Sequence, residues 1–213
     1  MSWIDDYLTL TSNHEAPDIC HKWVAVSSLA TALSRRVWLD RGYYKLYPNH
    51  YLIFVAESGA RKTVAAEFGV NAILRPVTSW TNINQILTDC ITKEELFAAL
   101  DRRQWEPGQD LEGRPAGNAE ALLFAEEFSV LMSGRNKEVG LAKSLASLYG
   151  CPDGPKEYRT KTAGSNFLFN VCINLLAATT PRWIVDGFPQ DAVGEGLMGR
   201  TIFVYFGVEP ARV

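Results

Sequence analysis

Residues 51–63 read YLIFVAESGARKT, an apolar run that leads into a short polar loop ending in Arg61, Lys62 and Thr63. A strand that delivers such a loop to the start of a helix is a common way to bind phosphate, because backbone N–H groups face the anion. The usual spacing is G-x-x-x-x-G-K-[ST], and here Ala56 and Arg61 stand where that pattern has glycine. The stretch therefore predicts a strand, a phosphate-binding loop and a helix, with two departures from the pattern.

Each part of this loop has an expected role. The backbone N–H groups would surround the α- and β-phosphates, Lys62 would be a solvent-facing cation that reaches the β- and γ-phosphates, and the Thr63 hydroxyl would bind Mg²⁺. Gly59 stands where a positive φ is most needed, and Ala56 adds only a methyl group. The Arg61 guanidinium should point away from the phosphates or toward the γ-phosphate. The predicted nucleotide-binding residues are Ser58, Gly59, Ala60, Arg61, Lys62 and Thr63. An ordinary strand–turn–helix with a surface Arg–Lys pair is the alternative interpretation.

Before this loop, the sequence predicts a helix and a hairpin. Residues 17–35 place apolar side chains at helical spacing after Pro17, which suits a first turn. Arg41 and Gly42 separate two short β-prone runs, which is typical of a hairpin. We expect residues 1–50 to pack on a core formed by residues 51–213, as one domain.

After the loop, the sequence predicts alternating helices and strands. Residues 63–74 continue as a helix, with Pro76 at its end or just beyond it, and Thr92 with Glu95 forms a capping box for the next helix. Residues 104–118 are polar and rich in glycine and proline, which predicts a surface loop.

Three further apolar runs predict buried strands, namely 121–125, 171–180 and 201–206, with a helix over 138–149 and a loop over 150–166. Four apolar strands separated by helices favour an α/β fold with a doubly wound, mainly parallel sheet.

The residues that follow two of these strands could complete a nucleotide site. In LLFAEEF, Glu126 is expected to hold Mg²⁺ and Glu127 to activate water, although the two roles could be shared or exchanged. Paired glutamates after an apolar run can also be a solvated strand end. Thr179 or Thr180 could sense the γ-phosphate or orient water, and capping the next helix is the equal alternative for them.

Two arginines are candidates for an arginine finger, which is a cation that one subunit supplies to the nucleotide of another. Arg200 precedes the last apolar strand, and Arg182 is its rival. A surface arginine beside a strand is the competing interpretation for Arg200.

Composition narrows the function classes. A formal net charge of −3 argues against a protein that coats nucleic acid over its whole surface, so such contacts should be confined to a groove or loop. The sequence has no apolar run of bilayer-spanning length, and acids stand near the start where a signal peptide carries basic residues. The four cysteines form no C-x-x-C pair, which predicts neither a zinc site nor a disulfide framework.

Together these motifs resemble the P-loop ATPase domains of phage and prophage helicase-primase-type replication proteins, in the RecA-like and AAA+ range. The resemblance covers nearly the whole chain and rests on the helix and hairpin before YPNHYLIFVAESGARKT, and on ITKEEL, LLFAEEF, LLAATTP and GLMGRTIFVY. In that family, a loop with Arg before Lys looks like a tolerated variant.

The resemblance implies a RecA-like fold, ATP and Mg²⁺ as ligands, single-stranded DNA as a partner, and a homo-oligomer such as a hexameric ring. The resemblance also implies a bacterial or phage-infected host cell, and the lack of a bilayer-spanning run and of a signal peptide predicts a cytoplasmic protein without a membrane partner. Lys62, Thr63 and Glu127 match the family pattern well, whereas Thr180 and Arg200 match it more loosely, as does Glu126.

The sequence thus predicts a Mg²⁺-dependent ATPase that is the motor domain of a replicative DNA helicase. The alternatives are an ATP-binding switch or loader that acts on a partner protein, a recombinase-like ATPase that forms filaments on DNA, and a structural subunit that no longer hydrolyses ATP. Lys156, Arg159 and Lys161 are the candidate nucleic-acid contacts.

Overall fold

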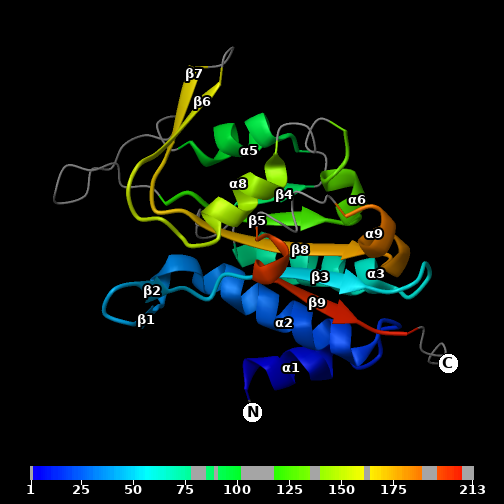
Figure 1. Ribbon diagram of the computed structural model, residues 1–213. Helices are drawn as coiled ribbons and strands as arrows, with labels where there is room; N and C mark the ends of the chain where they lie inside the picture. Colours follow the sequence, from blue (N-terminus) through cyan, green and yellow to red (C-terminus); the bar gives the residue numbers. More distant parts are fainter. Residues whose placement is uncertain are drawn as a thin grey trace.

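The computed structural model describes residues 2–77, 85–88, 91–101, 118–134, 140–160, 164–188 and 196–207. In these residues, five parallel strands form a central sheet with helices on both faces, and two antiparallel hairpins lie beside it (Figure 1). The fold is therefore α/β with a parallel sheet, which confirms that part of the prediction. No helix in the described ranges is both long enough and apolar enough to cross a membrane.

The N-terminal part forms the predicted helix and hairpin, preceded by one further helix. Its elements are α1 (Trp3–Leu10), α2 (Asp18–Leu33), the 3-10 turn η1 (Ser34–Arg36), β1 (Leu39–Asp40) and β2 (Lys45–Leu46). α1 begins with a capping box in which the Ser2 side chain accepts from Asp5 N–H and the Asp5 carboxylate accepts from Ser2 N–H. Leu39 pairs with Leu46 in the antiparallel β1–β2 hairpin.

The central sheet has the order β4-β5-β8-β3-β9. Its strands are β3 (Tyr51–Val55), β4 (Gln85–Thr88), β5 (Glu120–Ala125), β8 (Cys172–Thr179) and β9 (Thr201–Tyr205). β3, β5 and β8 are buried along their whole length, as expected for parallel strands covered on both faces. The sequence analysis missed β4, which is a half-exposed edge strand and so has no continuous apolar pattern.

The helices that connect these strands are α3 (Lys62–Phe68), the π-helical η2 (Gly69–Leu74), α5 (Lys93–Leu100), α6 (Phe128–Leu131), α8 (Leu141–Leu148), α9 (Pro181–Asp186) and the 3-10 turn η4 (Met198–Arg200). α5 begins at the predicted capping box. Helical geometry continues from η2 through residues 75–77, so the expectation that Pro76 ends or follows the helix is wrong. The helix before Pro76 is π-helical, and its last hydrogen bond runs from Arg75 N–H to Val70 O. Pro76 has no N–H of its own, so it leaves no backbone donor unpaired at this position.

Helices cover the two faces of the sheet in two separate cores. On one face, Tyr7 of α1, Val24 of α2 and Ala65 of α3 pack in a cluster with Leu52 and Phe54 of β3. The other core is formed by α5, α6 and α8 on the alternate strand residues, including Tyr51 and Ile53. The N-terminal helices are thus a covering layer of the sheet, rather than an appendage to it.

The segment expected to be a loop over residues 150–166 instead contains much of a hairpin. β6 (Lys156–Thr160) pairs antiparallel with β7 (Gly164–Leu168). The Tyr158 ring stacks on Phe97 of α5 at 3.9 Å, and Lys93 Nζ lies 5.0 Å from the centre of the Tyr158 ring. These contacts anchor the hairpin on α5, and its two strands extend away from the central sheet (Figure 1). The loop predicted over residues 104–118 lies outside the described residues, apart from Asn118.

Candidate functional site

Three strands end side by side at one edge of the sheet, at the right in Figure 1. β8 lies between β3 and β5, so the segments that follow these three strands are neighbours. The connection after β3 leads to β4 on one side of β3, and its helix α3 packs on one face of the sheet. The connection after β8 leads past β3 to β9, and its helix α9 packs on the other face. Ligands bind parallel sheets where connections diverge in this way, so this edge is the candidate site.

The loop after β3 has the backbone conformation that the sequence predicts at Gly59. Its φ is +84°, and Ala60 N–H bonds to Glu57 O at 3.3 Å, which makes residues 57–60 a tight turn. No atom lies within 4 Å of a Cβ built on Gly59, so the glycine is needed for its conformation and not for space. Arg61 is also left-handed, with a φ of 57°, where the usual pattern has glycine.

The Lys62 side chain lies inside this loop. Its Nζ donates hydrogen bonds of 3.1 Å to Ala56 O and 3.2 Å to Glu57 O, and the residue is only 7% exposed. The expectation of a solvent-facing cation is therefore wrong. The loop turns back over the ammonium group, because a buried cation must find hydrogen-bond acceptors and the nearest are the loop's own carbonyls.

Arg61 directs its guanidinium out of the loop. The side chain forms an ion pair with Glu15, in the segment between α1 and α2. The sequence allows two directions for the Arg61 side chain, away from the phosphates or toward the γ-phosphate. The structure has the first, so the Arg61 side chain lies outside the loop and the Lys62 side chain lies inside it. Both partners are at least one-third exposed, so this pair contributes little to stability.

The two glutamates after β5 have different environments. Glu126 is exposed, whereas Glu127 is partly buried and caps α6 by accepting from Ser129 N–H at 3.4 Å. The same oxygen, Glu127 Oε1, accepts a 3.0 Å hydrogen bond from Thr179 Oγ1. The strand register accounts for this contact: Ala125 pairs with Ala177, so two residues further along Glu127 reaches the level of Thr179.

The two threonines after β8 also differ. Thr180 Oγ1 accepts from Trp183 N–H at 3.3 Å and caps α9, with Pro181 in the first turn. The predicted catalytic threonine, Thr180, is therefore engaged in the helix cap. Thr179, the other residue considered, contacts Glu127. Thr179 is also tied to the loop, because Ala56 N–H bonds to Thr179 O at 3.3 Å.

The oxygen atoms at this edge suit a hard cation. Within the described residues no group of three or more His, Cys, Asp or Glu side chains could hold a metal by itself. Thr63 lies in the first turn of α3, and Glu126 and Glu127 follow β5. One hydroxyl with one or two carboxylates is the donor set typical of Mg²⁺, which keeps several waters and substrate oxygens as its other ligands.

Arg200 lies at the amino ends of the strands, opposite the end of the sheet that carries the candidate site. It precedes β9, which runs parallel to β3 with Thr201 opposite Tyr51, and its Nη1 donates to Gly196 O at 2.8 Å. Arg182, the rival candidate, is on α9, which follows β8 at the same end of the sheet as the Lys62 loop. Its Nε lies 3.5 Å from Asp186 Oδ2. Arg200 therefore does not lie beside the candidate site of its own chain.

Two of the predicted nucleic-acid residues, Lys156 and Arg159, lie in β6. Lys156 Nζ donates to Ser147 O at 3.2 Å and Ser147 Oγ at 2.8 Å, and partial burial lowers its pKa. Arg159 is exposed and donates to Glu157 Oε1 at 2.7 Å, a contact that raises the arginine pKa. Lys161 lies outside the described residues.

The sequence predicted neither the ion pair of Arg61 with Glu15 nor the burial of Lys62. Nothing in the residues around Glu15 distinguishes it from other surface acids, so no sequence signal could have identified that ion pair.

A comparison with known protein families finds no model that matches this chain, and a search of curated proteins finds no match to it.

Proposed function

We propose that this chain is a Mg²⁺-dependent ATPase of RecA-like fold that couples ATP hydrolysis to work on single-stranded DNA. One observation carries the proposal: β8 lies between β3 and β5, which gathers Lys62, Thr179 and Glu127 at a single edge of the sheet. A cation, a hydroxyl and a carboxylate on adjacent segments are the groups that phosphoryl transfer to water requires.

The environment of Lys62 supports a phosphate ligand. In the described part of the chain its hydrogen-bond acceptors are two neutral carbonyls, those of Ala56 and Glu57. A largely buried ammonium with neutral partners has much to gain from an anion, because charge-assisted hydrogen bonds are the stronger ones. Left-handed residues at Gly59 and Arg61 bend the backbone so that successive N–H groups can converge on the same anion.

The metal would be held by the Thr63 hydroxyl together with Glu126 or Glu127. When bound, Mg²⁺ would neutralise charge on the β- and γ-phosphates. α3 follows β3 and the two glutamates follow β5, and these strands are the two neighbours of β8, which supports this pairing of donors.

Glu127 is the residue best placed to accept a proton from the attacking water. Thr179 Oγ1 and Ser129 N–H both donate to its Oε1, so the carboxylate is held in one orientation. Its other oxygen, Oε2, would accept the water proton. In this scheme Thr179 positions the base, and Thr180 remains a helix cap.

An ATP-binding switch is the second candidate, and the contact between Glu127 and Thr179 also favours it. A carboxylate held by a neighbouring hydroxyl can change partners when a γ-phosphate arrives, and so transmit the nucleotide state to a bound protein. A switch of this kind would need little turnover.

Phosphate release with ATP in excess tests the proposal, measured with Mg²⁺, with EDTA, and with Mg²⁺ plus a single-stranded oligodeoxynucleotide. The motor predicts turnover that EDTA abolishes and single-stranded DNA accelerates. Nucleotide binding with little turnover and no response to DNA would favour the switch. No binding of ATP by the folded protein would contradict both and leave a structural subunit.

A further inference from the structure

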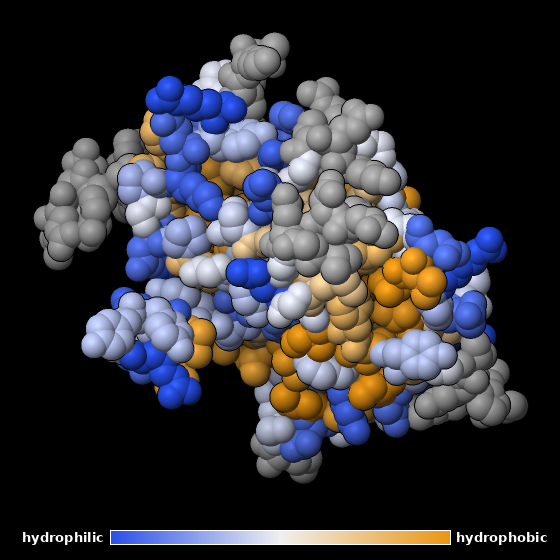
Figure 2. All heavy atoms as spheres, in the orientation of Figure 1, coloured by the Kyte–Doolittle hydropathy of each residue, from blue (hydrophilic) through white to orange (hydrophobic). Residues whose placement is uncertain are grey.

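A second candidate site lies at the other edge of the sheet from Lys62. It is a cleft of about 730 Å³, between the segment that contains β2 and continues to Asn49, the end of α8, and η4. In Figure 1, η4 lies near the amino ends of β3 and β9 and the β1–β2 hairpin lies further to the left, and in Figure 2 this hairpin stands away from the body of the molecule on that side. The volume is in the range of known ligand sites.

The residues that line this cleft include three tyrosines and two cationic residues, among small, polar and apolar ones. Tyr44, Tyr47 and Tyr149 contribute rings, and Lys45 and Arg200 contribute positive charge. The described residues that line the cleft include no aspartate or glutamate. In a chain of net negative charge, a cleft with cations and no lining carboxylate favours an anionic ligand.

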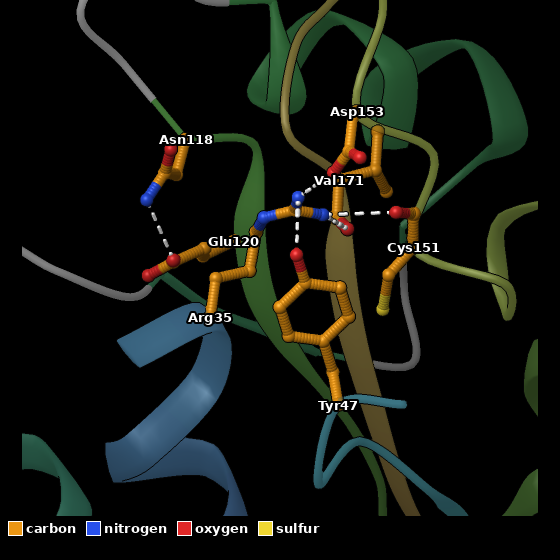
Figure 3. A network of polar contacts seen from close by, with 7 residues as sticks. All are labelled: Arg35, Tyr47, Asn118, Glu120, Cys151, Asp153 and Val171. Carbon is orange, nitrogen blue, oxygen red and sulfur yellow. Dashed lines mark hydrogen bonds and ion pairs between the residues drawn. The ribbon is translucent and has the colours of Figure 1, made fainter. Parts of the chain in front are cut away.

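The walls of the cleft are tied to each other. Arg35, whose side chain is 9% exposed, donates to Tyr47 Oη at 2.9 Å on one wall and to Cys151 O at 2.9 Å on the other. Figure 3 shows this guanidinium between the two walls, where it also contacts Asp153 and Val171 O. A second tie runs from Asn49 Nδ2 to Tyr149 O, at 2.8 Å. The walls of the cleft are thus held together by partly buried polar contacts.

The ring of Tyr44 is available for stacking. Tyr44 is 59% exposed although it lines the cleft, and the next residue, Lys45, supplies a cation. One further basic side chain lies beside the cleft: Lys156, the first residue of β6, donates to Ser147, which lines the cleft at the end of α8. Aromatic rings interleaved with cations along a groove are the arrangement that binds single strands, because bases stack on the rings and phosphates meet the cations.

We propose that this cleft binds a single-stranded polynucleotide, with bases on Tyr44 and phosphates near Lys45. The proposal deepens the DNA-coupled function proposed above by locating the strand, but it does not require that the carboxyl edge hydrolyse ATP. Arg200 also lines the cleft, and the role expected for it toward a neighbouring subunit is tested separately.

Fluorescence anisotropy with labelled dT20 and U20, without nucleotide, separates this proposal from ATP turnover. We expect Tyr44→Ala to weaken binding of the strand by about 5- to 100-fold through loss of stacking. Lys45→Gln should reduce the slope of log affinity against log salt by about one. Tyr43→Ala is the matched control, because the neighbouring Tyr43 is fully exposed and does not line the cleft, and it should bind like the native protein.

The two oligonucleotides distinguish DNA from RNA, and tighter binding of either one supports the site. No binding of either strand by the native protein overturns the proposal, whatever its ATPase activity. Equal losses in Tyr43→Ala and Tyr44→Ala, or unchanged affinity in both cleft variants, also overturn it. Circular dichroism of each variant shows that the fold is kept, and a change in subunit association with unchanged affinity would assign the cleft to a protein partner instead.

Discussion

The Thr179 hydroxyl donates a 3.0 Å hydrogen bond to Glu127 Oε1 and thereby connects the ends of β8 and β5. Thr179 is fully buried, and its backbone carbonyl accepts from Ala56 N–H at the start of the loop after β3. One residue thus contacts both the loop and the proposed base. If Glu127 activates water, its orientation depends on this hydroxyl.

Replacing Thr179 with valine should slow ATP hydrolysis by about 10- to 100-fold, because it removes one hydrogen bond to a charged group while keeping the side-chain shape. Single-turnover kinetics and a separate ATP-binding titration measure the two effects. Thr179→Ser keeps the hydroxyl and should retain most of the activity. Equal rates in the valine and serine variants would show that the hydroxyl does not position the base.

Glu127→Gln should bind ATP and Mg²⁺ but stop hydrolysis, because an amide cannot accept the proton of water. Nucleotide affinity and phosphate release, measured on the same preparation, check this expectation. A variant that loses Mg²⁺-dependent nucleotide binding would identify Glu127 as the metal ligand, and Glu126 would then be the candidate base.

Arg200→Ala should bind ATP almost normally and hydrolyse it about 10³-fold more slowly, if Arg200 meets charge on a neighbour's nucleotide. Because Arg200 lies at the edge of the sheet away from Lys62, only a head-to-tail arrangement could bring it there. Mixing this variant with Glu127→Gln should restore activity, since some interfaces then contain both intact groups. Turnover that is independent of protein concentration, with no rescue on mixing, would show that Arg200 has no role in catalysis.

Gly69→Ala should destabilise the fold by about 1 to 3 kcal/mol through overpacking between η2 and α2. A Cβ on Gly69 would collide with Val24 Cγ1 and lie 3.2 Å from Ser28 Oγ, and both atoms belong to the helix that covers this face. Urea denaturation of the variant measures the loss. Gly150→Ala is the control, because no atom lies within 4 Å of its built Cβ. A loss in Gly150→Ala as large as in Gly69→Ala would contradict the packing argument.

Three of the four strands that the sequence predicts, β3, β5 and β8, are buried along their whole length, whereas the fourth, β9, is an apolar edge strand that is only partly buried. The runs at 51–55 and 121–125, and the longer run in β8, are apolar because helices cover both faces of the sheet there. β4 escaped detection because an edge strand can be half polar, and the β6–β7 hairpin escaped because it is stabilised by contacts with α5, such as Tyr158 on Phe97, which local pattern does not record.

The candidate site was predictable in its residue types but not in its contacts. The stretch from Tyr51 to Thr63 predicted a strand, a turn and a helix, which the structure confirms, and Gly59 has the expected positive φ. The burial of Lys62 and the choice of Thr179 over Thr180 depend on how the chain turns back on itself and on the register of two strands distant in sequence. Neither property is encoded within a short motif.

The most direct test is ATP binding by Lys62→Ala, compared with native protein and with Arg61→Ala, by calorimetry in Mg²⁺. Lys62 lies inside the loop, whereas the Arg61 side chain pairs with Glu15 outside it. The account predicts that Lys62→Ala abolishes ATP turnover and weakens binding at least tenfold while thermal unfolding stays cooperative, and that Arg61→Ala changes binding little. Near-native ATP binding and hydrolysis by a folded Lys62→Ala protein would contradict the account.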